Sequence, residues 1–245
     1  MAPFLATDYY GTLRQKGAAR QMAHSVEEDY LAAIYNMQME GESVIGARLA
    51  ALFKVKAPTV TQTIHRLEKQ HLVVVDAHKR LDLTPAGRTT AEALLRRHRL
   101  SERFLVDVMG MQWHEVHDEA ARLEHVISPA FEARMLAQLD NPTTCPHGNP
   151  IPGQVEAPDF LRRQHAYRLD TAPPGALVVV LTISEVVEDE QALITLLHGK
   201  GLTPGTELVV VDRGTNGGCV VLVNGGQVHV AADVAHMVWV RTVAP

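Results

Sequence analysis

Apolar residues recur at helical spacing through the first part of the chain, with short polar breaks between the stripes. Ser25-Val-Glu-Glu28 has the form of a capping box and predicts the start of a helix. A short helix is expected around 46–53, and Pro58 suits the first position of a third helix. The apolar runs on either side of the polar turn 76–80 predict a small hairpin. Three helices and a hairpin in this order are typical of a winged helix-turn-helix, which we assign to residues 25–93.

A second helical region follows the hairpin. Thr84-Pro85 is expected to cap a long helix that runs to about Met109. Further helices are predicted over 113–127 and from Ser128-Pro129 to about 139. We therefore assign a helical domain to residues 94–153.

From Ala176 onward the pattern changes to short apolar runs broken by Gly or Asp turns, with one helix expected at about 190–198. Five short strands predict an SH3-like β-barrel over 176–245, so the whole fold is expected to be mainly α with β. The strands are expected at 177–183, 207–211, 219–223, 227–230 and 237–243. Outside the three domains, residues 1–24 are interpreted as an N-terminal arm and residues 154–175 as a linker.

Composition limits the class of protein. Hydrophobic residues make up 46% of the 245 positions, which supports buried cores rather than a disordered chain. No apolar run reaches the ~18–20 residues of a membrane span, and the N-terminus lacks the pattern of a secretory signal. We therefore expect a cytoplasmic protein with no membrane partner. The two cysteines, Cys145 and Cys219, are too few for a disulfide framework and are expected to be thiols.

Charge is distributed unevenly along the chain. The total is −5, but between Gly46 and Arg99 eleven Lys and Arg residues stand against four acidic ones, a local net charge of +7. A basic segment within an acidic chain is typical of a surface that contacts phosphate groups. This distribution favours nucleic acid as the partner of the winged helix, with protein contact as the alternative.

Polar side chains lie off the apolar stripe of the helix that begins at Pro58. Gln pairs with adenine edges, and Thr contacts thymine methyl groups or phosphate, so this helix suits the major groove. The basic hairpin tip suits the neighbouring DNA backbone. The expected DNA contacts are Lys56, Pro58, Thr59, Thr61, Gln62, Arg66, Lys79 and Arg80.

Acidic, imidazole and thiol side chains occur in spacings that are typical of metal ligands. His98 and Glu102 are four residues apart on the long helix and share a face, while Cys145-Pro-His147 places two donors in one loop. The helical pair alone is more typical of exposed surface residues, and Cys-Pro-His alone fits a loop with a buried thiol as well as a metal ligand. Their joint occurrence beside a winged helix predicts a metal sensor. The other candidate ligands are Asp29, His117, Glu124, His125, Glu185 and Glu188.

A series of motifs lies between Ser25 and Gly153: Glu28-Asp-Tyr-Leu-Ala-Ala-Ile-Tyr35, Ala57-Pro-Thr-Val-Thr-Gln-Thr63, Leu83-Thr-Pro-Ala-Gly87, Arg97-His-Arg-Leu-Ser-Glu102, Val116-His-Asp-Glu119, Leu123-Glu-His-Val126 and Gly148-Asn-Pro-Ile-Pro-Gly153. Together they resemble the diphtheria toxin repressor and manganese transport regulator family of bacterial repressors. Gly199-Lys-Gly-Leu-Thr-Pro-Gly205 is similar to the SH3-like, FeoA-type third domain of the longer members. The resemblance implies a helical dimerisation domain, a homodimer on a double-stranded DNA operator, and two divalent-metal sites.

The resemblance also implies the ligands of each site. The first would use His98, Glu102 and His117, closed by Glu185 and Glu188 from the barrel and joined by Cys145 and His147, as in the streptococcal manganese-responsive members. The second would use Asp29, Glu124 and His125. Ala121 stands where the family places Cys or Glu, and Ala32 replaces a Glu of the manganese regulators. These two departures weaken the second site.

The implied metal follows from the chemistry of the donors. Asp29 stands where the iron-responsive members carry Met, and a hard carboxylate favours Mn²⁺. Cys145 and the imidazoles pull toward Fe²⁺, Co²⁺ or Zn²⁺. We therefore expect a manganese-responsive repressor of metal-uptake genes. Fe²⁺ is the alternative metal, and Co²⁺, Ni²⁺, Zn²⁺ or Cd²⁺ would substitute in vitro.

Three other functions are open to these residues. A metallohydrolase is disfavoured because the sequence has no His-Glu-x-x-His run, serine nucleophile elbow or phosphate loop, so we expect neither an enzyme nor a small organic substrate. A repressor that senses oxidants through Cys145 is the second alternative. A DNA-binding protein that is indifferent to metal is the third.

Overall fold

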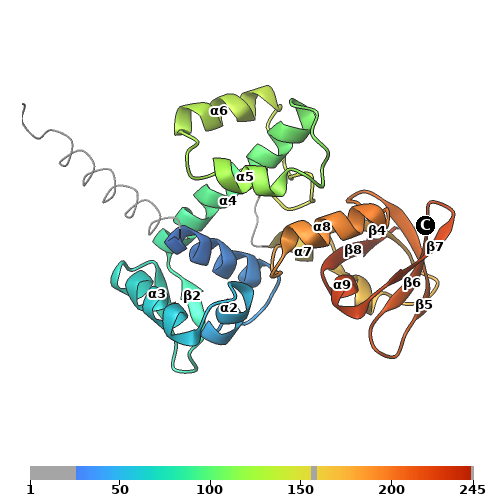
Figure 1. Ribbon diagram of the computed structural model, residues 1–245, viewed down its shortest axis with the longest axis horizontal. Helices are drawn as coiled ribbons and strands as arrows, with labels where there is room; N and C mark the ends of the chain where they lie inside the picture. The colour runs from blue at the N-terminus through green and yellow to red at the C-terminus, as the bar shows by residue number, and fades with distance from the viewer. Residues whose placement is uncertain (1–25, 156–158, 244–245) are drawn as a thin grey trace, which may run out of the picture.

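The computed structural model describes residues 26–155 and 159–243, so the predicted N-terminal arm, 1–24, lies outside the described residues. Figure 1 shows N-terminal helices with a hairpin, a pair of helices above them, and a sheet with its own helices on the other side of the molecule. This arrangement confirms the predicted fold class. Within the described ranges, no helix has both the length and the apolar character needed to cross a membrane.

The winged helix folds around one apolar core. Leu31, Ile34 and Tyr35 on the first helix are fully buried, as their spacing predicts. Pro58 lies in the first turn of α3, where its missing N–H costs no hydrogen bond. The elements are a helix over 26–39, α2 Gly46–Leu52, α3 Ala57–Lys69, and the antiparallel strands β1 Val73–Val75 and β2 Leu81–Leu83.

The long helix α4, Pro85–Asp107, connects the winged helix to the second helical region. The Thr84 hydroxyl caps it by accepting a hydrogen bond from the Gly87 backbone N–H at 3.1 Å. A Cβ at Gly87 would lie 1.9 Å from the Leu72 carbonyl oxygen, so only glycine lets the helix pack this close to the hairpin. The helices that follow are α5 His117–Leu123 and α6 Pro129–Gln138.

The single helix predicted over 113–127 is wrong, because only α5 is helical within it. Before α5, the Trp113 ring packs against the core of the barrel instead of continuing the helical face. After α5, the guanidinium of Arg97 donates to the Glu124 carbonyl oxygen at 2.6 Å, which satisfies a group at the helix end. Tertiary contacts therefore set both ends of the helix.

The barrel is one antiparallel sheet with the strand order β3-β8-β4-β5-β6-β7. All five predicted strands are present, with boundaries within two residues of those expected. The strands are β3 Tyr167–Arg168, β4 Leu177–Ile183, β5 Glu207–Arg213, β6 Cys219–Val223, β7 Gly226–Val230 and β8 Val238–Thr242. The helices beside them are α8 Glu190–Gly199 and α9 Ala232–His236.

Part of the predicted linker 154–175 belongs to the sheet. Tyr167 in β3 pairs with Val240 in β8, so the sheet begins before residue 176. Arg168 anchors this strand, because its guanidinium lies 3.9 Å from the centre of the Trp239 ring. The same segment also contains α7 Phe160–Arg163 and the short 3₁₀ helix η2 Leu169–Thr171.

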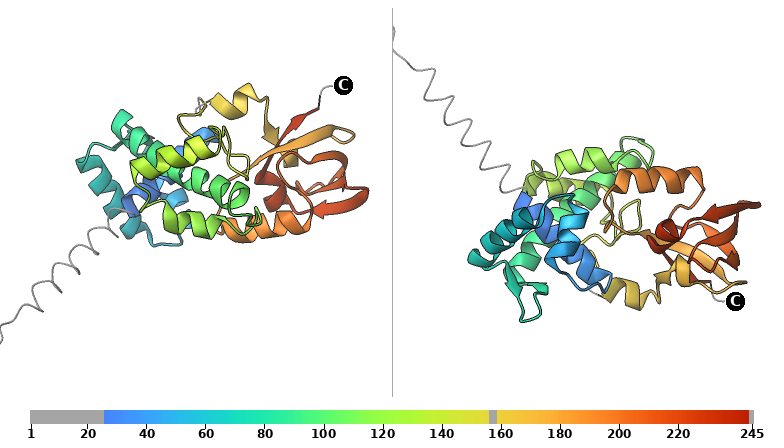
Figure 2. Two further views of the ribbon diagram at one scale, coloured as in Figure 1. Left: turned by 90° about the horizontal axis from the view of Figure 1, so that it is seen from above. Right: turned by 60° about the horizontal axis from the view of Figure 1, so that its bottom comes forward.

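The barrel docks on both the winged helix and the helical domain, as the second view in Figure 2 also indicates. Arg168 forms an ion pair with Glu40, at the end of the first helix, at 2.6 Å. Val186, just beyond β4, is buried within the core of the winged helix. A Cβ at Gly148 would lie 2.1 Å from the Leu181 carbonyl oxygen, so the loop that carries Cys145 and His147 lies directly against the barrel backbone.

Candidate metal centre

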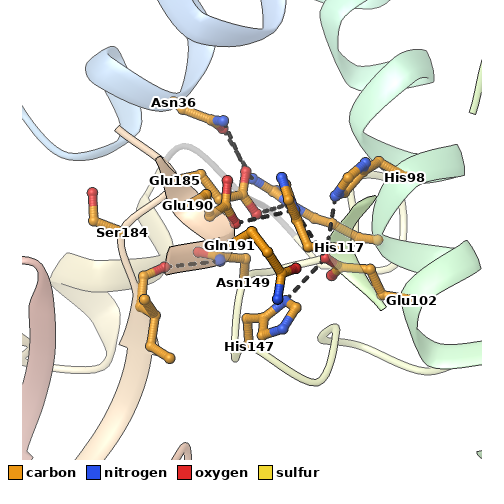
Figure 3. A network of polar contacts seen from close by, with 12 residues as sticks. Asn36, His98, Glu102, His117, His147, Asn149, Ser184, Glu185, Glu190 and Gln191 are labelled. Atoms are coloured by element: carbon orange, nitrogen blue, oxygen red, sulfur yellow. Dashed lines mark hydrogen bonds and ion pairs between the residues drawn. The ribbon is translucent and has the colours of Figure 1, made fainter. Parts of the chain in front are cut away.

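A buried carboxylate on α4 lies at the middle of the candidate site. Glu102 is 1% exposed, and His98, one helical turn before it, is 7% exposed. Three imidazole nitrogens face Glu102 Oε1: His98 Nε2 at 3.1 Å, His117 Nδ1 at 3.5 Å and His147 Nδ1 at 3.0 Å. Figure 3 shows these rings converging on the carboxylate from α4, α5 and the loop after α6.

Several of these buried atoms have no hydrogen-bond partner. Glu102 Oε2 is one of them, and His117 Nδ1 and His147 Nδ1 have only their ion-pair contacts with carboxylate oxygens. Buried polar atoms are rarely left unsatisfied, because each one costs about 1–3 kcal/mol. A carboxylate oxygen and two imidazole nitrogens are also the donors that a divalent transition metal prefers. The residues present therefore fit a divalent metal ion.

The charged groups of this pocket shift one another's pKa values. Burial by itself would raise the pKa of Glu102, but His147 and His98 outweigh it and hold that pKa well below its usual range. Burial likewise opposes protonation of His117, yet Glu190 and Glu102 raise its pKa to about 9. Without a metal, the pocket thus holds an ionised Glu102 carboxylate beside a protonated His117 imidazole at neutral pH.

We expect metal binding to release protons, because coordination needs an imidazole nitrogen that carries no proton. At any pH below about 9, His117 must lose a proton before it can coordinate, so metal affinity should fall as the pH falls. Each proton released per metal lowers the observed affinity about tenfold per pH unit. Calorimetric titration in buffers of different ionisation enthalpy measures this release. A binding heat that is independent of the buffer would contradict it.

Cys145 and His147 form a second set of donors around the same carboxylate. The structure places donor atoms of Glu102, Cys145 and His147 within 4.8 Å of one another, as it does those of His98, Glu102 and His117. Cys145 is 1% exposed, and burial raises the pKa of its thiol well above the usual range. The two triads share Glu102, so one pocket offers a nitrogen-rich set and a set that contains sulfur.

The barrel carboxylates take different positions from those predicted. Glu185 is held by the Arg99 guanidinium at 2.6 Å and by the Asn36 amide at 2.8 Å. The side chain of Glu188 is 57% exposed and lies 3.6 Å from Lys54 Nζ. Neither belongs to a triad of donor atoms among the described residues, although both line the cavity beside the site.

Glu190 is the barrel carboxylate that faces the imidazoles, and the sequence reasoning missed it. Its Oε1 lies 3.5 Å from His117 Nδ1, and burial raises its pKa to about 7. Glu190 is the first residue of α8, and an acidic residue in the first turn of the helix expected at 190–198 was the available signal. Its position brings the barrel to this candidate site.

A second cluster lies along the same cavity. Donor atoms of Asp29, Glu124 and His125 lie within 4.8 Å of one another. Burial raises the pKa of Asp29 to about 6, whereas hydrogen bonding to Glu124 raises the pKa of His125 to about 9. Glu124 Oε2 also lies 2.5 Å from His98 Nδ1, so this residue links the two clusters.

One cavity of about 310 Å³ extends past both clusters. Its wall includes Ala32 and Ala121, which offer no side-chain donor to a metal. The second cluster therefore has three donor residues of its own, Asp29, Glu124 and His125, and an apolar surface beside them. Glu28, also unforeseen, contacts His125 Nδ1 at 3.1 Å.

The predicted DNA-contacting residues lie at the start of α3, along it and at the hairpin of the winged helix. All of them are exposed except Arg66, which is half-buried because its guanidinium lies 3.3 Å from Glu27. Arg80 at the hairpin is paired with Asp76 at 2.7 Å, which lowers its net contribution to the basic surface. A shallow hollow along α3 is lined by Ala57, Pro58, Thr61, Gln62, His65, Arg66 and Lys69. His65 and Lys69 were not predicted, but they share this face.

Three family models cover most of the chain. Residues 22–81 match the N-terminal DNA-binding domain of iron-dependent repressors. Residues 84–153 match the metal-binding and dimerisation domain of the same repressors, and residues 167–242 match the FeoA domain. The last match begins at β3, in agreement with the start of the sheet.

Individual proteins agree with these models. The iron-dependent repressor IdeR of Mycobacterium leprae is 40% identical over 223 residues, which are 88% of this chain and 96% of that protein. The diphtheria toxin repressor of Corynebacterium diphtheriae is 36% identical over 222 residues, 86% of this chain and 94% of that protein. A solved manganese-dependent transcriptional repressor in complex with manganese is 34% identical with a TM-score of 0.76, covering 89% of this chain and 100% of its own. The chain therefore belongs to the iron-dependent repressor family that includes the diphtheria toxin repressor, whose members are metal-dependent, DNA-binding transcriptional repressors and not enzymes.

Proposed function

We propose that this chain is a manganese-responsive repressor that binds an operator as a homodimer and controls metal-uptake genes in the cytoplasm. The observation that carries the proposal is the buried Glu102 carboxylate, whose Oε2 has no partner while three imidazoles face its Oε1. Such a group is costly in a metal-free protein and is satisfied by a bound cation.

The donors come from all three domains of the protein, which are the winged helix, the helical domain and the barrel. Asp29 lies on the first helix of the winged helix, Glu102 on α4, His117 on α5 and Glu190 on the barrel. A bound divalent metal would supply positive charge and directed bonds among these groups. Asp29, Glu124 and His125 would then hold the winged helix against α5, and Glu190 would hold the barrel against the same helices.

This ordering would act on the spacing of the two DNA-reading helices. In a homodimer, each α3 reads one half-site, and the half-sites lie about 34–36 Å apart along the DNA. The metal would fix the winged helix relative to the dimerisation helices and so favour the arrangement that binds DNA. The metal-free protein would instead sample several arrangements. We place Thr59, Thr61 and Gln62 at the bases, and the basic residues at the backbone.

Manganese is favoured by the oxygen donors. Asp29, Glu102, Glu124 and Glu190 offer hard carboxylates, which suit Mn²⁺ better than softer metals. Fe²⁺ is the second candidate, because four histidines contribute imidazoles and relatives that match the sequence are iron-dependent repressors. Anaerobic titration of labelled operator DNA with Mn²⁺ and with Fe²⁺ separates the two. A response to Fe²⁺ alone at cellular metal concentrations would overturn the manganese assignment.

Cys145→Ser is expected to weaken binding of soft metals more than binding of Mn²⁺. The thiolate is a preferred ligand of Zn²⁺ and Cd²⁺, whereas Mn²⁺ gains little from sulfur. We expect Cd²⁺ affinity to fall by more than the ~100-fold that loss of an outer partner of a ligand can cause, and Mn²⁺ affinity by less than the ~10-fold at the lower end of that range. Competition titrations measure the affinities for both metals. The control variant is Cys219→Ser, which changes the other cysteine, buried in the barrel. Equal losses for the two metals would contradict the expectation. A buried thiol with a raised pKa also does not favour sensing of oxidants through Cys145.

A further inference from the structure

The loop between α4 and α5 is held by the barrel through aromatic side chains. The indole Nε1–H of Trp113 donates to Nδ1 of His198, on α8, at 3.0 Å. The Trp113 ring also packs against the barrel core. His114 stacks on the same His198 ring, with 3.7 Å between ring centres and 13° between planes. Gln191, the second residue of α8, donates to the His114 carbonyl oxygen.

The backbone of this loop also contacts the metal site. The Trp113 carbonyl oxygen lies 2.8 Å from Nε2 of His147. A carbonyl oxygen only accepts hydrogen bonds, so Nε2 carries the proton and donates it. This bond turns the other ring nitrogen, Nδ1, toward Glu102 Oε1 at 3.0 Å. His147 is 1% exposed, so water does not replace the carbonyl as its partner.

We propose that Trp113 is a positioning residue through which barrel helix α8 sets the ring orientation of His147 at the Glu102–Cys145–His147 triad. His198 and the barrel core fix the indole, the fixed indole places its own backbone carbonyl, and that carbonyl aligns the imidazole. The barrel thus orients His147 in one set of donors through Trp113, apart from the Glu190 carboxylate that it offers directly beside His117. This inference rests on the proposed metal-binding function.

The hydrogen-bond partners of metal-ligating histidines contribute measurably to metal affinity. Removing such a hydrogen bond commonly lowers metal affinity about 10–100-fold. The second cluster provides an internal reference, because Asp29, Glu124 and His125 have no contact with Trp113 or His198 among the interactions found in the described residues. A positioning effect should therefore change the affinity of the Glu102–Cys145–His147 triad more than that of the second cluster, which it reaches only through the Glu124–His98 contact.

The test uses the full chain with Co²⁺ as the probe, because a thiolate-to-cobalt absorption band reports on Cys145. Trp113→Phe keeps an aromatic side chain but removes the indole N–H, and His198→Ala removes the acceptor. Each should weaken the titration of this band about 10-fold. His198→Gln, whose amide oxygen can accept from the indole, should recover most of the loss. The double variant should bind no more weakly than either single variant, because both break one link.

A metal-free measurement separates this inference from the proposed function. Nitrogen-15 NMR of labelled histidine should show a hydrogen-bonded Nε2–H of His147 in the wild-type protein and its loss in His198→Ala. The control is His229→Ala, which removes an exposed barrel histidine on β7 and should change neither readout. If the wild-type protein shows no cobalt–thiolate band, the proposed site fails while the NMR result still decides the positioning role. Three results would each overturn the positioning role. The first is an unchanged cobalt titration and His147 signal in His198→Ala. The others are additive losses in the double variant and an equal loss in His229→Ala.

Discussion

Glu102→Gln should abolish metal-dependent operator binding. The substitution keeps the size of the side chain but removes the charge that faces the imidazoles of His98, His117 and His147 at 3.0–3.5 Å. Because Glu102 belongs to both donor triads of this pocket, neither of them remains intact, and only the separate Asp29–Glu124–His125 cluster keeps all its donors. We expect Mn²⁺ affinity to fall by more than the ~100-fold that loss of an outer partner can cause. Operator affinity in Mn²⁺ should then equal that of the metal-free protein.

The matched control for this prediction is Glu119→Gln on α5. The side chain of Glu119 is 47% exposed, and among the described residues its ion pair is with Arg122 at the surface. Surface ion pairs contribute little, about 0–1 kcal/mol, so both metal and operator binding should be retained. Anisotropy of labelled DNA and metal titration measure the two quantities. A Glu102→Gln protein that binds Mn²⁺ and operator normally would remove the basis of the proposed site.

Arg99→Met is expected to have the largest effect on stability. Arg99 is 3% exposed and joins three parts of the protein by donating to Glu185 at 2.6 Å, to the Asn36 amide oxygen at 2.9 Å and to the Pro150 carbonyl oxygen at 2.7 Å. Its loss leaves the Glu185 carboxylate buried without a cation, which typically costs about 3–5 kcal/mol. The free energy of unfolding from denaturant titration should fall accordingly, and the barrel should separate first.

Two further variants distinguish a lost ion pair from general damage. Arg99→Met combined with Glu185→Leu removes both charges, so much of the stability should return. Arg48→Met breaks an ion pair with Glu42 in which the arginine side chain is 52% exposed, and it should cost less than about 1 kcal/mol. If Arg99→Met were no more harmful than Arg48→Met, the barrel would not be held by this contact.

Local patterns in the sequence predicted the elements well. The stripe of Leu31 and Ile34 identifies the buried face of the first helix, and the strand 177–183 is found with the predicted bounds. Such elements bury residues at a fixed period, so the sequence itself carries the signal. The helix predicted over 113–127 failed because Trp113 packs on a distant part of the chain. Periodicity within one element does not report where its residues pack.

The candidate site was predictable in its helical part and less so at the barrel. His98 and Glu102 share a face because they are four residues apart on one helix. The choice among Glu185, Glu188 and Glu190 depends instead on how α8 lies against α5. Arg99 neutralises the first of these and Lys54 lies beside the second, which leaves Glu190 facing His117. No spacing rule within the segment contains that information.

The central claim is that metal binding and operator binding are coupled in this protein. The most direct measurement compares operator affinity with and without Mn²⁺, and Mn²⁺ affinity with and without operator, on the same preparation. The account predicts that each ligand strengthens the other by the same factor, because coupling free energies are reciprocal. If operator affinity is the same after every ion has been removed, the coupling does not exist and the account is wrong.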